Sequence, residues 1–288
     1  MQKGVPMIGE NIHNMHWYPS TNRVPFQIWF SNYCKKHNKT FQRKYLDVHW
    51  DYFHSCRFLG NEESHREKEI LDRYMADLNP EDKYFAVIGS NREHISFPKD
   101  TLFFLESGGV FAEECKESVI IPYFVNPRPK PNTARNRIYT VSFLGNYHTH
   151  PLRESMAETC RRIGNTCVLH TTNISVDGFY NVMEQSIFSL CPRGTELTSY
   201  RLYESLFCGA IPVYVSDYFS LPFQNLINWE DICINVSLEE IHRIPEILLS
   251  LSGDRIKEMQ DAIKETVEKY LNEDFTCRFI SEIADLPW

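Results

Sequence analysis

The 288-residue chain lacks several features that would each assign it to a broad class of proteins. It has no run of about 18 apolar residues, the length a membrane-spanning helix needs, and no signal-like apolar core at the N-terminus. Its nine cysteines are an odd number and include no Cys-x-x-Cys pair. We therefore expect reduced cysteines that pack as small hydrophobes, in a soluble cytoplasmic protein without a stable membrane anchor.

Positive charge is also scarce. The formal net charge is −8, which argues against nucleic acid or an anionic membrane as a partner, because both need a concentrated basic surface. Hydrophobic residues make up 42% of the chain and charged residues 24%, which is typical of a globular protein with a buried core. The length allows one large domain or two modest ones.

A carboxylate pair for a divalent metal is missing as well. No Asp-x-Asp occurs, the carboxylate pair with which many enzymes bridge a divalent cation to a diphosphate. The histidine pairs at 13/16, 49/54 and 148/150 have no further ligands at zinc spacing. We expect neither a metal nor another cofactor.

The most informative segment is 187–215, whose pattern predicts a strand, a loop, a helix, a turn and a second strand. Apolar runs at 187–191 and 211–215 suit buried parallel strands. Thr198 or Ser199 is suited to cap the intervening helix, and Gly209 suits its C-terminal stop. This pattern predicts a helix N-terminus at the carboxyl end of a parallel sheet.

Such a position favours phosphate groups, because free backbone N–H groups and the helix dipole both attract an anion. Arg193 and Gly194 open the loop, and Arg201 follows in the helix. Glu204 lies one turn later, where a carboxylate can accept hydrogen bonds from ribose hydroxyls. The alternative is an ordinary strand–helix–strand unit with surface arginines and a solvated glutamate, and spacing alone leaves both open.

Alternating strands and helices elsewhere predict a parallel α/β protein. The stretch 124–137, with prolines at 127, 129 and 131, suits an interdomain linker. We place an N-terminal domain at 1–130 and a C-terminal domain at 131–288, with the last helix a candidate to cross back. The other expected strands are 84–88, 101–105, 119–121, 138–144 and 167–170, and the other expected helices are 61–78, one starting at His150-Pro151, one opened by a Ser237–Glu240 capping box, and 254–271.

The same residues resemble the signature of the exostosin family of glycosyltransferases. The resemblance is carried by Cys-Pro-Arg-Gly at 191–194, Ser-x-Arg-x-x-Glu at 199–204, Gly-x-x-Pro-Val-x-x-Ser-Asp at 209–217 and Leu-Pro-Phe at 221–223. Weaker similarity extends to Phe-Leu-Gly at 143–145 and His-Pro-Leu-Arg-Glu at 150–154. Tyr200 and Asp51 depart from the family pattern, in which proline and, in short members, threonine are common.

The resemblance implies a GT-B-like fold, in which two Rossmann-like domains with parallel sheets face a central cleft. The N-terminal domain would bind the acceptor and the C-terminal domain the nucleotide sugar. The donor-binding residues that it implies, together with the local pattern, are Gly145, Arg153, Arg193, Gly194, Thr198, Ser199, Arg201 and Glu204. Without a metal, the arginines would stabilise the leaving diphosphate.

The family resemblance further implies an inverting enzyme, whose catalytic base belongs to the acceptor domain. Asp51 is the preferred candidate, with His49, Asp47 and Glu10 as alternatives. Trp50 is a candidate platform for the acceptor sugar; the alternative is that Trp50 is a core residue between solvated neighbours.

The implied reaction moves a sugar from a UDP-sugar to the hydroxyl of an oligosaccharide or glycoprotein glycan. UDP-xylose is the first expectation, by similarity to compact soluble members such as those of large algal viruses, which would place the protein in the host cytoplasm. Galactose, glucuronate and N-acetylglucosamine stay open as donor sugars. The alternatives are a non-catalytic module that binds a nucleotide sugar or glycan, and a GDP-fucose-dependent fucosyltransferase.

Overall fold

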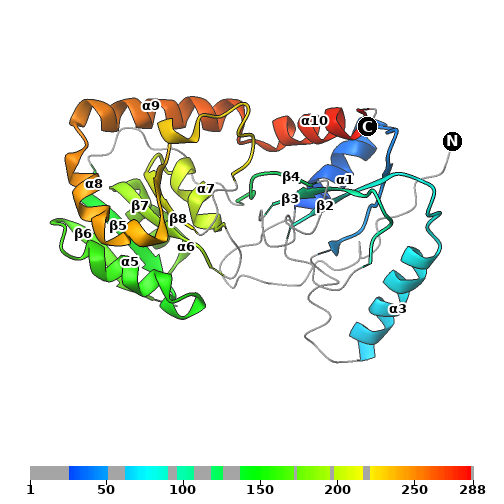
Figure 1. Ribbon diagram of the computed structural model, residues 1–288, viewed down its shortest axis with the longest axis horizontal. Helices are drawn as coiled ribbons and strands as arrows, with labels where there is room; N and C mark the ends of the chain where they lie inside the picture. Colours follow the sequence, from blue (N-terminus) through cyan, green and yellow to red (C-terminus); the bar gives the residue numbers. More distant parts are fainter. Residues whose placement is uncertain are drawn as a thin grey trace. The chain divides into compact units, whose positions relative to one another are not determined.

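A computed structural model of the protein describes residues 26–50, 62–89, 96–106, 118–125, 137–171, 174–194, 198–216 and 221–286 (Figure 1). The chain divides into two compact units. The first comprises Arg23–Tyr123 together with Glu273–Trp288, and the second is essentially Phe124–Asn272. The predicted boundary between residues 130 and 131 lies outside the described residues.

The first unit contains a parallel sheet with strand order β1-β2-β3-β4. The expected strands at 84–88, 101–105 and 119–121 are present, in slightly shifted form, and β1 joins them at the edge. The strands are β1 Lys44–Tyr45, β2 Tyr84–Ile88, β3 Leu102–Leu105 and β4 Ser118–Ile120, and the helices are α1 Phe26–Lys36, α3 Glu62–Ala76 and α10 Glu273–Ala284. Helix α10 comes from the far end of the sequence, yet it packs with α1 of this unit (Figure 1).

Both faces of this sheet are apolar, as expected for a parallel sheet covered by helices. On one face, Phe30 of α1 meets Phe85 of β2 with ring centroids 6.0 Å apart, and Phe85 meets Phe104 of β3 at the same distance. On the other face, Trp50 and Phe103 belong to a core cluster against which side chains of α3 pack.

The second unit contains a five-stranded parallel sheet of order β6-β5-β7-β8-β9. Its strands are β5 Tyr139–Gly145, β6 Thr166–His170, β7 Ser186–Pro192, β8 Ile211–Val215 and β9 Ile234–Val236. Its helices are α5 Leu152–Cys160, α6 Val176–Glu184, α7 Tyr200–Phe207, α8 Ile244–Ser250 and α9 Gly253–Lys269, with short 3₁₀ helices η1 Tyr147–Thr149, η2 Trp229–Asp231 and η3 Leu238–Arg243.

The direction in which the chain adds strands to this sheet reverses between β5 and β7. The chain steps outward from β5 to β6, then returns to β7 on the other side of β5 and proceeds to β8 and β9. In doubly wound sheets of this order, ligands bind outside the carboxyl ends of the strands at that reversal, the topological switch point. Strand order therefore singles out the carboxyl ends of β5 and β7.

At the opposite edge of the sheet, a half-buried arginine binds backbone carbonyls. Arg137 donates hydrogen bonds to the carbonyls of Ser186 (2.6 Å) and Gly209 (2.7 Å), and more weakly to those of Glu184 and Cys208. Burial lowers the pKa of its guanidinium. Gly209 has φ +68°, a left-handed conformation that suits glycine at a helix end, and a Cβ there would lie 2.9 Å from Arg137 Nη2.

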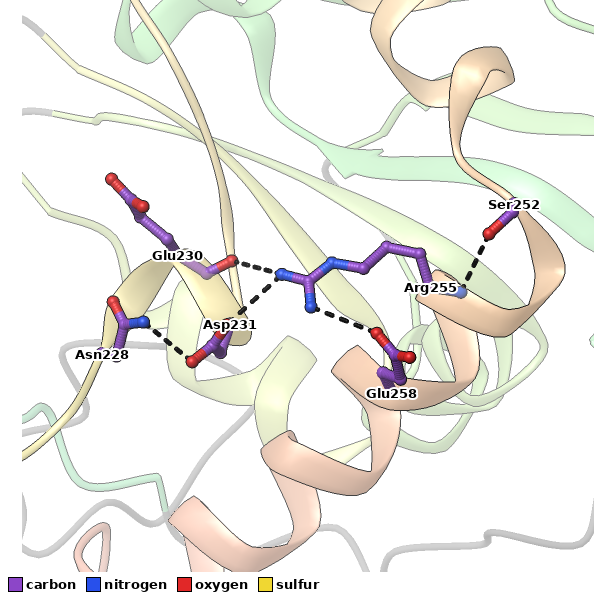
Figure 2. A network of polar contacts seen from close by, with 6 residues as sticks. All are labelled: Asn228, Glu230, Asp231, Ser252, Arg255 and Glu258. Carbon is purple, nitrogen blue, oxygen red and sulfur yellow. Dashed lines mark hydrogen bonds and ion pairs between the residues drawn. The ribbon is translucent and has the colours of Figure 1, made fainter.

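A polar network fastens η2 to α9 (Figure 2). Arg255 of α9 donates to the Glu230 carbonyl and to Asp231 Oδ1, both at 3.3 Å, and to Glu258 Oε2 at 3.4 Å. Ser252 caps the helix by accepting the Arg255 N–H at 3.1 Å. Because the partners are exposed, each ion pair contributes at most about 1 kcal/mol, and the network fixes geometry more than it adds stability.

One local prediction is wrong. The Ser237–Glu240 pattern predicts a capping box that opens a helix, but the helix that begins there is the 3₁₀ helix η3, and the Ser237 side chain caps no backbone N–H. Its hydroxyl instead lies 3.0 Å from Glu240 Oε2. The α-helix α8 starts only at Ile244.

The predicted α/β fold with two units, each built on a parallel sheet, is confirmed. The expected cleft between the units stays a prediction. In the part of the chain that the structure describes, no helix is both long and apolar enough to cross a membrane.

Candidate functional site

The candidate site of the second unit lies at the carboxyl ends of β5 and β7, on the two loops that flank the switch point. Gly145 ends β5 and is followed by Asn146, while Pro192 ends β7 and is followed by Arg193 and Gly194. The sequence placed Gly145, Arg193 and Gly194 in a donor site, and the structure brings their backbones to one edge of one sheet.

Helix α7 starts on the same side of the sheet, because it follows the carboxyl end of β7. Ser199 is its N-cap, and the Ser199 hydroxyl accepts the Arg201 N–H at 3.3 Å. Thr198, the other predicted cap, is the residue before the N-cap, and it is buried. One turn further along α7, the Ser205 hydroxyl donates to the Arg201 carbonyl at 2.7 Å. Serine hydroxyls thus hydrogen-bond a backbone N–H and a backbone carbonyl in the first turns of the helix.

Arg153 of α5 joins the two loops across the switch point. Its Nε donates to the Arg193 carbonyl at 3.0 Å, and its Nη1 donates to the Asn146 carbonyl at 3.1 Å. A Cβ at Gly194 would lie 2.9 Å from Arg153 Nη2, so the absent side chain at Gly194 makes room for the guanidinium. Arg153 therefore sets the spacing of the loops as well as placing a positive charge between them.

Arg201 of α7 has a similar arrangement at the end of β5. Its Nη2 donates to the Leu144 carbonyl at 2.6 Å, and its guanidinium carbon lies 4.3 Å from the ring centroid of Phe143 and 5.2 Å from that of Phe179. A Cβ at Gly145 would lie 2.9 Å from Arg201 Nη2. The guanidinium is thus held by a carbonyl and two aromatic rings, which fixes its charge at the sheet edge.

Arg193 and Glu204 complete the predicted donor residues. Arg193 is half-buried, and its backbone N–H lies 3.4 Å from the Val215 carbonyl at the end of β8. Glu204 of α7 is only 5% exposed, so it is not the solvated glutamate of the alternative reading. Its contact with a ribose stays a prediction.

The nearby thiol is not a nucleophile. Cys191 in β7 is buried, with its Sγ 3.4 Å from the Ser205 hydroxyl. Burial raises the pKa of Cys191 to about 11, so the thiol is neutral at physiological pH. The chemistry of this edge therefore comes from cations, hydroxyls and backbone amides.

The first unit holds the predicted acceptor-side residues. Asp47, two residues past β1, accepts a hydrogen bond from the Ser31 hydroxyl of α1 at 2.9 Å. Trp50 is fully buried in the core cluster, 5.0 Å from the Phe97 ring, which favours the packing alternative for this residue. His49 is 8% exposed, so it is not a solvated neighbour of Trp50. Asp51 and Glu10 lie outside the described residues.

Sequence reasoning missed two residues that the structure places at sheet edges. Asn146 supplies a carbonyl to Arg153, and its side chain accepts the His148 N–H at 2.8 Å, which starts η1. Glu106 follows β3 and is 4% exposed. A charged residue directly after the apolar run 101–105 was the available signal for Glu106.

Among the described residues, no three histidine, cysteine, aspartate or glutamate side chains are grouped so as to hold a metal ion. Whether the reaction needs a metal is a property of its activity, so the expected absence of a metal requirement stays a prediction.

Comparison with known proteins agrees with the signature at this site. Residues 91–251, more than half of the chain, match the Exostosin GT47 domain. The chain is 26% identical over 180 residues to "Probable glucuronoxylan glucuronosyltransferase IRX7" of Arabidopsis thaliana, covering 57% of this chain and 40% of that protein. It is 38% identical over 90 residues to "Exostosin-1 homolog" of Caenorhabditis elegans, covering 31% and 24%. The chain thus spans less than half the length of either relative.

A solved structure, WaaG, "a glycosyltransferase involved in lipopolysaccharide biosynthesis", aligns with a TM-score of 0.44 at 11% identity, over 89% of this chain and 81% of that one. Another, T4 phage BGT in complex with its UDP-glucose substrate, has a TM-score of 0.39 at 13% identity, over 74% and 77%. The match to residues 91–251 includes the whole switch-point edge, from β5 through α7 and β8. The chain belongs to the exostosin GT47 family.

Proposed function

We propose that this protein is a glycosyltransferase that moves a sugar from a nucleotide diphosphate sugar to a glycan hydroxyl. The observation that carries the proposal is the switch-point edge of the second unit, where Arg153 is bonded to the loop carbonyl of Arg193 and Arg201 lies in the first turn of α7. Cations and helix amides there suit a diphosphate, and family membership supports a sugar nucleotide as its source.

In the proposed reaction, the acceptor oxygen attacks the anomeric carbon of the donor while the bond to the diphosphate breaks. The diphosphate leaves with the bonding electrons, and positive charge at the sheet edge stabilises it. Arg193 is the proposed direct partner of the diphosphate. Arg153 and Arg201 hold the loops that surround it, since their guanidinium groups are bonded to backbone carbonyls.

We propose further that the donor is a UDP-sugar, that transfer inverts the anomeric configuration, and that no metal is needed. UDP-xylose is the first candidate, from the resemblance to compact family members. UDP-glucuronate is the second, because the matched plant relative carries a glucuronosyltransferase name. Glu204, in the second turn of α7, is the proposed ribose contact.

A thermal-shift panel of UDP-xylose, UDP-glucuronate, UDP-galactose, UDP-N-acetylglucosamine and GDP-fucose tests the donor. We expect stabilisation by UDP and its sugars. Stabilisation by GDP-fucose alone would instead identify a fucosyltransferase.

Release of free UDP from the best donor, with and without a glycan acceptor mixture, then separates an enzyme from a binding module. Stabilisation without any turnover in either condition would refute the transferase proposal. Anomeric configuration of the product, determined by NMR, tests inversion directly.

A further inference from the structure

Helix α6 carries a phenylalanine beside the candidate site that the proposed function has not used. Phe179 is half-buried, whereas the buried side chains of α6 are Tyr180 and Met183. The ring centroid of Phe179 lies 5.2 Å from the guanidinium carbon of Arg201 and 5.6 Å from the ring centroid of Tyr180. The contact with a cation therefore distinguishes Phe179 from the core residues of its own helix.

Local hydrogen bonds fix the position of Phe179 at the sheet edge. Helix α6 follows β6, so its first turn lies on the same side of the sheet as the candidate site. Ser175 is the N-cap, and its hydroxyl accepts the Gly178 N–H at 3.1 Å. The Phe179 N–H donates to the Ser175 carbonyl at 2.9 Å, which closes the first turn. The backbone of Phe179 is thus held at the start of α6.

Strand β5 supplies the other contacts of the same guanidinium. The ring centroid of Phe143 lies 4.3 Å from the guanidinium carbon of Arg201, and Arg201 Nη2 donates to the Leu144 carbonyl at 2.6 Å. Side chains two residues apart on a strand share a face, so Phe143 and Gly145 lie on the face that Arg201 crosses. A Cβ at Gly145 would lie 2.9 Å from Nη2, so the glycine leaves the space that the guanidinium fills.

Arg201 therefore joins three elements at the switch point. It belongs to α7, it is bonded to the end of β5, and it lies against the ring of Phe179 on α6. Helix α6 packs against both β5 and α7. Because a cation is attracted to the face of an aromatic ring, Phe179 opposes movement of the guanidinium away from the end of β5. An aliphatic side chain at position 179 would fill space without that attraction.

We propose that Phe179 is a positioning residue of the donor site, which acts by holding Arg201 in the orientation that binding of the donor diphosphate requires. This inference rests on the proposed function. Phe179 needs no contact with the nucleotide, because its ring orients the guanidinium and the guanidinium holds the end of β5. The property that matters at position 179 is an aromatic face rather than apolar volume.

The test compares Phe179→Leu and Phe179→Tyr with Phe275→Leu, a matched change at a half-buried phenylalanine of the first unit. Calorimetry measures the affinity for UDP, and thermal unfolding measures Tm. We expect Phe179→Leu to weaken UDP binding about 3- to 30-fold, the factor to which a partly desolvated cation–π contact converts. Phe179→Tyr keeps the ring, so its UDP affinity should stay within about twofold of wild type, as should that of Phe275→Leu.

A double-mutant cycle separates positioning from packing. If Phe179 acts through Arg201, adding Phe179→Leu to Arg201→Ala should cause no further loss of UDP affinity. Additive losses would overturn the proposal, and so would equal losses in Phe179→Leu and Phe179→Tyr. A lower Tm of Phe179→Leu with unchanged UDP affinity, or loss of its folded state seen by circular dichroism, would assign the ring to structure instead. Absence of UDP binding by the wild type would refute the proposed function itself.

Discussion

Replacing Gly145 by alanine tests whether the glycines at the switch point exist to accommodate arginines. A Cβ at Gly145 would lie 2.9 Å from Arg201 Nη2, closer than carbon and nitrogen tolerate. The guanidinium cannot retreat without loss, because Nη2 donates to the Leu144 carbonyl at 2.6 Å and the group lies against the rings of Phe143 and Phe179.

The expected cost follows from the contacts that must be given up. A hydrogen bond from a charged donor contributes about 1.5–3 kcal/mol, and a cation–π contact about 0.5–2 kcal/mol. Replacing glycine by alanine offsets about 0.4–1 kcal/mol of this loss, because it lowers the conformational entropy of the unfolded chain. We therefore expect the free energy of unfolding to fall by about 1–4 kcal/mol, which lowers Tm by roughly 2–4 °C per kcal/mol in a unit of this size.

Gly164 provides the matched control, because a Cβ there would meet nothing within 4 Å. Urea unfolding of Gly145→Ala and Gly164→Ala should therefore differ, with only the first destabilised. UDP binding by calorimetry should weaken in the first variant alone, since Arg201 is displaced from the sheet edge. Equal stabilities of the two variants would refute the argument that Gly145 accommodates Arg201.

Three further predictions concern charge, metal and pH. Arg193→Ala should weaken UDP binding about 10- to 150-fold with unchanged Tm, whereas Arg201→Ala should lower both UDP affinity and Tm. Calorimetry measures the affinity and thermal unfolding the Tm. Unchanged UDP affinity in both variants would refute the assignment of the donor site. Sugar transfer should persist after exhaustive chelation, and loss that only manganese or magnesium restores would contradict metal independence. Burial raises the pKa of Cys160 to about 12 and that of Cys191 to about 11, above the ordinary 9.0. The unfolded chain thus releases these protons first, and the free energy of unfolding should fall above pH 9 by about 1.4 kcal/mol per pH unit for each thiol. Urea midpoints at pH 8 and pH 10 measure the effect, which Cys191→Ala should reduce and which a flat profile would exclude.

The local sequence determined the elements of the second unit at the candidate site. The apolar runs that became β7 and β8 are short and bounded by turn residues, and the Ser199 cap and the left-handed Gly209 mark the ends of α7. These signals depend on interactions within a few residues, so they predict the ends of the elements without knowledge of the rest of the fold. The Ser237–Glu240 pattern shows their limit, because a correct cap spacing opened a 3₁₀ helix.

Tertiary structure decided the roles of the same residues. Sequence identified Arg153 and Arg201 as cations, but their partners, the carbonyls of Arg193 and Leu144, are 40 and 57 residues away. Only the strand order, which places β5 beside β7, brings these carbonyls within reach. Burial of Glu106 likewise depends on how β3 is inserted between β2 and β4. Residue type is fixed along the chain, whereas the neighbours that give a charge its function are fixed by packing between distant segments.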